Sequence, residues 1–192
     1  MRPRIFLICC LEVLKILKES RMSVGEQILM QVQEAAKMKH ELVSLLVPFA
    51  ATDTLLYLSD VLNEKIQKEV DDAIKSANEI MGTKFVPVLG LEVCRQNIEQ
   101  QEIVRRYLEK TDDYRFAVVY LAATELRSVL AGVLLANRAL SADDVFQLTF
   151  AEELAQQERW GKDEEIKKRQ QAIKQRIIEL EKVCNERSLF EN

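Results

Sequence analysis

The stretch AEELAQQERWGKDEE, residues 151–165, surrounds the only tryptophan of the chain, Trp160, with carboxylates on both sides. Two carboxylates that converge can act as a general acid and a general base. Adjacent residues on a helix point about 100° apart, so Glu152 and Glu153 cannot converge by themselves. Acid–base catalysis would therefore need a carboxylate from a distant segment, for example Asp53 together with Glu153.

Other catalytic and metal-binding patterns are missing from the 192 residues. There is no glycine-rich phosphate loop and no nucleophile elbow. The only histidine, His40, has Lys37 three positions before it, which rules out the Glu-x-x-His motif of di-iron bundles. The four cysteines lack zinc-site spacing and fit free thiols in a reducing compartment. We therefore predict no catalytic residue, no metal, no cofactor and no enzyme activity.

Charge and hydropathy exclude two further classes of protein. The net charge is −4, and no basic run is interleaved with aromatic residues, so we predict no nucleic-acid binding. The longest apolar run, residues 116–136, contains Glu125 and Arg127, so we predict no membrane insertion.

Glu153 stands out from the pattern around it. It lies seven residues after Phe146 and seven before Trp160, so the three share one line if residues 141–160 form one helix. A carboxylate on such a line is either a structural group, paired with a cation or capping the next helix, or part of a partner-binding surface. We expect Trp160 to pack mainly in the core and Gly161 to form the corner after it.

Glu152 lies elsewhere on the same helix, beside Gln156, whereas Gln157 flanks Glu153. The predicted partner-binding surface consists of Glu153, Glu152, Gln156, Gln157 and Phe146.

Residues with high helix propensity dominate the composition, and proline occurs at only three positions. We predict an all-α fold with a single domain of six or seven helices. Their approximate ranges are 5–19, 24–47, 62–80, 95–110, 114–137, 141–160 and 163–186. The second of these should end before Pro48, and Thr52 or Asp53 is a plausible N-cap of a short helix that follows. An extended connector should lie near 84–92.

The expected domain organisation has three parts. Residues 1–24 form an N-terminal extension, residues 25–187 form the helical domain, and residues 188–192 form a tail. Ser141 and Asp144 have capping-box spacing at the start of one predicted helix.

The segment from Leu140 to Glu165 resembles a signature of the ATP synthase assembly chaperones that handle the α subunit of the F1 head. That signature is Leu-Ser-x-acid-acid, then an acidic pair, then Gln-x-x-x-Trp-Gly followed by acids. The matching residues are Leu140, Ser141, Asp143, Asp144, Glu152, Glu153, Gln156, Trp160, Gly161, Asp163, Glu164 and Glu165. Upstream, FAATDTLLY and GLEVCRQ resemble two further family stretches, and order and spacing agree from about residue 28 to residue 166.

This resemblance implies a molecular chaperone in F1-ATPase biogenesis. Such a protein binds the unassembled α subunit, covers its assembly surface and releases it when the β subunit arrives, without nucleotide or metal. The resemblance gives a functional role to Glu153 or, alternatively, to Glu152. It implies the bacterial cytoplasm or the mitochondrial matrix, and we expect a monomer.

The resemblance covers the helical domain of that family, and the family's N-terminal β domain has no counterpart in residues 1–27. Two alternatives therefore stay open. One is a non-catalytic helical module for structure or protein interaction, and the other is a helical enzyme in which Asp53 and Glu153 converge.

Overall fold

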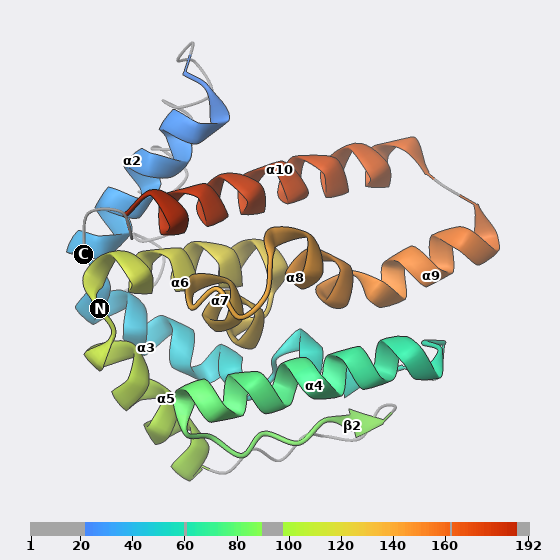
Figure 1. The fold of residues 1–192 in the computed structure, drawn as a ribbon, viewed down its shortest axis with the longest axis horizontal. Coiled ribbons are helices and arrows are strands. Elements are labelled where there is room, and N and C mark those ends of the chain that lie inside the picture. Colours follow the sequence, from blue (N-terminus) through green and yellow to red (C-terminus); the bar gives the residue numbers. More distant parts are fainter. Residues whose placement is uncertain (1–21, 60, 90–97, 162, 188–192) are drawn as a thin grey trace.

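The computed structural model describes residues 22–59, 61–89, 98–161 and 163–187, and these form a mostly helical domain (Figure 1). Its helices are α2 (Val24–Lys37), α3 (Lys39–Ala50), α4 (Glu64–Met81), α5 (Ile98–Lys110), α6 (Asp113–Leu126), α7 (Val129–Ala136), α8 (Ala142–Thr149), α9 (Ala151–Trp160) and α10 (Glu164–Arg187). A 3₁₀ turn, η1 (Thr54–Leu56), leads into β1 (Tyr57–Leu58), which pairs in parallel with β2 (Val88–Leu89). The predicted all-α class is confirmed. The segment predicted as a helix at 5–19 lies outside the described residues.

The described part of the chain has nine α-helices because three predicted helices are each divided in two. The divisions fall at Met38 (φ −102°, ψ 13°), Arg127 (φ 55°) and Phe150 (φ −104°, ψ 9°). None of these residues is Gly or Pro, so the sequence carries no local signal for a break. The expected stop before Pro48 is wrong: α3 includes Pro48 in its last turn and continues to Ala50.

The core is built around α6 and α7. All eight residues of α7 are buried, as expected of a helix that is apolar on every side. Helices α2 and α10 pack on α6, and α4 packs on α7 (Figure 1). Helix α10 contributes Ile177 and Leu180, both fully buried. No described helix is long and apolar enough to cross a membrane.

Gly132 allows α6 and α7 to approach closely. A Cβ atom at this position would lie 2.6 Å from the carbonyl oxygen of Val119. We predict that Gly132→Ala lowers the free energy of unfolding by about 1–3 kcal/mol, because backbone must shift to accept the methyl group. Chemical denaturation measures this change. Gly25→Ala is the matched helical control: its Cβ would meet only the flexible end of Glu179, so equal destabilisation of both variants would contradict the prediction.

Asp53 is a fully buried carboxylate that connects η1 to α7. Its Oδ1 accepts hydrogen bonds from the Ser128 hydroxyl (2.7 Å) and the Leu55 N–H (3.0 Å), and its Oδ2 accepts one from the Leu130 N–H (3.0 Å). Burial raises the pKa of Asp53 to about 6, while these hydrogen bonds act in the opposite direction. Asp53, and not the exposed Thr52, is therefore the N-cap residue.

Candidate functional site

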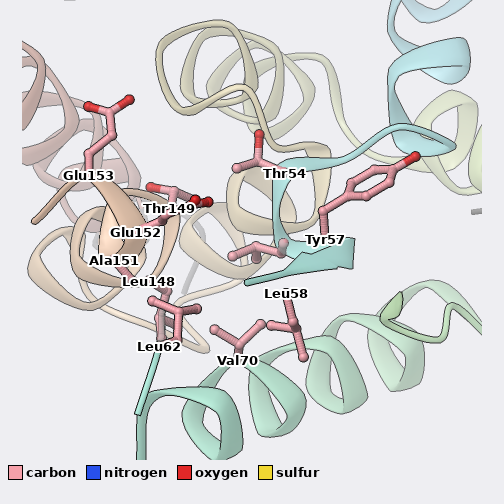
Figure 2. A pocket seen from close by; sticks show the side chains of 11 residues that line it. Thr54, Tyr57, Leu58, Leu62, Val70, Leu148, Thr149, Ala151, Glu152 and Glu153 are labelled. Carbon is pink, nitrogen blue, oxygen red and sulfur yellow. The ribbon is translucent and has the colours of Figure 1, made fainter. Parts of the chain in front are cut away.

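A small cleft lies where η1, β1 and α4 meet the junction of α8 and α9 (Figure 2). Its lining residues are Thr54, Leu55, Tyr57, Leu58, Leu62, Val70, Leu148, Thr149, Ala151, Glu152 and Glu153. Leu55, Leu62 and Val70 are buried and supply an apolar floor, whereas the carboxylates stand exposed at the rim. The cleft has a volume of about 110 Å³. A drug-sized ligand needs roughly 300–1,000 Å³, so this cleft fits one protruding side chain of a protein better than a free small molecule.

The α8–α9 junction positions the acidic rim. Ser141 and Asp144 form the predicted capping box at the start of α8, which fixes where that helix begins. Phe146 and Phe150 stack with ring centroids 4.7 Å apart, and the chain turns at Phe150 before α9 begins at Ala151. The assignment of Phe146 to the partner-binding surface needs correction. It is only 4% exposed, so it supports the junction from inside.

Glu152 and Glu153 are both exposed at the first turn of α9. In Figure 2 the Glu153 side chain points away from the cleft, whereas Glu152 lies beside Thr149. Glu153 accepts a hydrogen bond of 3.3 Å from the amide of Gln170 on α10. Glu152 accepts one of 3.3 Å from Gln156. Neither carboxylate has an ion-pair partner among the described residues. The hypothesis that Glu153 is a structural group paired with a cation is therefore wrong.

The other predicted members of the surface lie further along α9. Gln156 is exposed and Gln157 is half-buried. The Gln157 carbonyl accepts the N–H of Gly161, which has φ 99° and ends the helix. Asp163, not Glu153, caps the next helix by accepting the N–H of Glu165 at 2.7 Å.

The expectation that Trp160 is a core residue is wrong. Its side chain is 82% exposed at the corner between α9 and α10. The expectation relied on a continuous helix from 141 to 160, and the break at Phe150 invalidates a count of helical phase across it. We predict that Trp160→Ala changes the free energy of unfolding by less than about 0.5 kcal/mol, since it removes an exposed side chain. A melting curve checks this, and a loss of several kcal/mol would show that the indole packs.

The structure does not bring Asp53 and Glu153 together. Asp53 is buried with its oxygens engaged and does not line the cleft that carries Glu153, so the proposed convergence of these two groups is wrong. No group of three His, Cys, Asp or Glu side chains in the described ranges could hold a metal ion. An apolar floor with an acidic rim is instead suited to binding a complementary protein surface.

Sequence reasoning missed the side of the cleft formed by Thr54, Tyr57 and Leu58. These residues belong to FAATDTLLY, the segment that carried part of the resemblance to the assembly chaperones. The resemblance of this segment to the assembly chaperones was a signal that these residues matter. Helical periodicity could not show that they lie opposite α9.

Solved structures share the fold of this chain at low sequence identity. Atp12 from Paracoccus denitrificans superposes with a TM-score of 0.71 at 19% identity, covering 81% of this chain and 68% of that one. The chain has the Atp12 fold. An aspartate-to-lysine mutant of the same Atp12 matches with a TM-score of 0.72 and the same identity and coverage. The fold expected from the sequence resemblance is thereby confirmed.

A third solved structure with the Atp12 fold comes from Agrobacterium tumefaciens and is described as a candidate chaperone. It matches with a TM-score of 0.66 at 20% identity, covering 81% of this chain and 59% of that one. No protein-family model matches the chain, and no curated protein matches its sequence. Two of these three solved structures are thus named Atp12 and the third is named as a chaperone.

Proposed function

We propose that the chain is an assembly chaperone for the F1 sector of ATP synthase and that it binds the unassembled α subunit. The observation that carries the proposal is the cleft at the η1–α9 junction. In a chain with the Atp12 fold, it is lined by two of the three stretches that resemble the assembly chaperones, with residues of FAATDTLLY on one side and the Glu152–Glu153 pair on the other.

The cleft supports reversible protein binding on physical grounds. Its buried leucine and valine floor offers apolar contact, and the exposed carboxylate of Glu152 at its rim offers a charge-assisted hydrogen bond to a lysine or arginine. Hot spots of protein interfaces have this arrangement, in which a central pocket takes one anchor side chain. A cleft of about 110 Å³ engages a small part of a partner, which is suited to later release.

The proposed activity requires no nucleotide, metal or bond-breaking step. The chaperone would cover the assembly surface of the α subunit until the β subunit takes its place. Its place of action would be the cytoplasm of a bacterium or the matrix of a mitochondrion, where F1 is assembled.

Co-purification tests the proposal. The tagged chain is co-expressed with the α subunit alone, with the β subunit alone, and with both. We expect the α subunit to co-purify when expressed alone, and much less of it when the β subunit is present. A chain that captures neither subunit, while remaining folded by circular dichroism, would favour a helical structural or interaction module with another partner.

A further inference from the structure

Three polar side chains that line the cleft can accept hydrogen bonds but have no hydrogen left to donate. The Thr54 hydroxyl donates to the carbonyl of Arg127 at 2.8 Å, and the Thr149 hydroxyl donates to the carbonyl four residues before it at 2.7 Å. A hydroxyl has one hydrogen and two acceptor lone pairs, so both oxygens can now only accept. The carboxylate of Glu152, beside Thr149, is an acceptor as well (Figure 2). Tyr57 carries its hydroxyl away from these three groups (Figure 2).

The lining of the cleft contains negative charge and no positive side chain. It includes Glu152 and Glu153 but no Lys, Arg or His. Arg127 accepts the Thr54 hydroxyl through its carbonyl, but its exposed side chain is not part of the lining. The N-terminus of α9 adds a partial charge of about +0.5, which the two carboxylates in its first turn exceed. A complementary occupant therefore carries a positive charge and several hydrogen-bond donors.

The apolar part of the cleft suits a side chain with an aliphatic stem. Leu55, Leu62 and Val70 are buried, and Leu148 is half-buried. Lysine and arginine both lay their methylene groups along apolar surface while the charged end stays near water. The two side chains differ in how their donors are arranged.

The arrangement of acceptors favours lysine over arginine. The three donors of an ammonium group diverge and rotate freely, so they can reach acceptors on η1, α8 and α9 together. A guanidinium fork is planar and binds best to both oxygens of one carboxylate. Oε1 of Glu152 already accepts the amide of Gln156 at 3.3 Å, so a fork would compete with that bond.

We propose that the cleft selects a lysine side chain of its protein partner. The ammonium group binds Glu152, Thr54 and Thr149, and the aliphatic stem lies on the leucine and valine floor. The proposal rests on the proposed function, since it names the type of residue by which the α subunit would be held. It makes Thr54 and Thr149 determinants of specificity, a role that the sequence did not indicate for either residue.

Model compounds test the selection directly. Nα-acetyl-lysine methylamide, its arginine analogue and its uncharged norleucine analogue are each titrated into the full chain with ¹³C-labelled methyl groups. The methyl resonances of Leu62, Val70 and Leu148 are followed by NMR. We expect the lysine compound to shift these resonances and to bind at least threefold more tightly than either analogue. Equal or tighter binding of the arginine or norleucine compound would overturn the choice of lysine.

Thr124 provides a matched control for Thr149. Its hydroxyl also donates to the carbonyl four residues before it, at 2.8 Å, but Thr124 is exposed on α6 and does not line the cleft. Thr149→Val and Thr124→Val therefore lose the same kind of bond, and we expect equal melting temperatures. Thr149→Val should bind the lysine compound and the unassembled α subunit at least fivefold more weakly than wild type, whereas Thr124→Val should bind both normally.

The outcomes separate this proposal from the proposed function. If Thr149→Val binds both ligands as Thr124→Val does, the hydroxyl takes no part and the proposal falls, while capture of the α subunit by the wild-type chain still supports the chaperone. If the wild-type chain selects the lysine compound but does not bind the α subunit, the proposed function falls. The selection of lysine then stands, with a different protein as the partner.

Discussion

Asp53→Ala is expected to lower the free energy of unfolding by about 3–5 kcal/mol, enough to unfold much of a marginally stable domain. The carboxylate is fully buried and accepts hydrogen bonds from a serine hydroxyl and two backbone N–H groups. Alanine would leave those donors buried without acceptors, and each unmet donor costs about 1–3 kcal/mol. Urea denaturation followed by circular dichroism measures the change.

Thr52→Ala is the control for this prediction. Thr52 precedes Asp53 and is exposed, so its loss should cost less than about 0.5 kcal/mol. Asp53→Asn should also destabilise the domain. Its side-chain NH₂ group would replace one carboxylate oxygen and would face a donor that now gives a hydrogen bond to that oxygen. An Asp53→Ala variant as stable as Thr52→Ala would show that Asp53 does not hold η1 against α7.

Glu152→Lys is expected to weaken binding of the α subunit by about 2–5 kcal/mol while leaving the melting temperature unchanged. The residue is exposed and makes a single hydrogen bond, to a neighbour on its own helix, so reversing its charge disturbs no buried group. The lost contact is the charge-assisted bond that the cleft rim would offer a partner's lysine or arginine. Titration calorimetry with the purified α subunit measures the effect.

Two other charge-reversal variants serve as comparisons for Glu152→Lys. Glu109→Lys makes the same change of charge on the exposed surface of α5, away from the cleft, and should bind as wild type does. Glu153→Lys tests the residue to which the sequence resemblance first assigned the functional role. Its side chain points away from the cleft and contacts Gln170, so we expect a smaller loss than for Glu152→Lys. Equal binding by Glu152→Lys and Glu109→Lys would refute a role for the acidic rim.

Much of the fold could be predicted because its signals are local. The all-apolar stretch near α7 and the capping box at Ser141 are each fixed by a few neighbouring residues. The breaks at Arg127 and Phe150 could not be predicted, because tertiary contacts impose them on residues that are otherwise compatible with helix.

The errors at the candidate site have one common cause. Counting 100° per residue from Phe146 to Trp160 placed both aromatics and Glu153 on one line. The turn at Phe150 breaks the count between Phe146 and Glu153, so Phe146 is buried in α8 while Glu153 and Trp160, seven residues apart within α9, are both exposed. The role of Asp53 was also underestimated, since its partners Ser128 and Leu130 lie more than seventy residues away in sequence.

The proposed chaperone holds the α subunit only until the β subunit arrives. The most direct measurement is the amount of purified α subunit bound to the immobilised chain, before and after β subunit is added. We expect stable capture of the α subunit, followed by its release into complexes that contain both subunits and exclude the chain. Failure to capture the α subunit, or capture that the β subunit does not reverse, would contradict it.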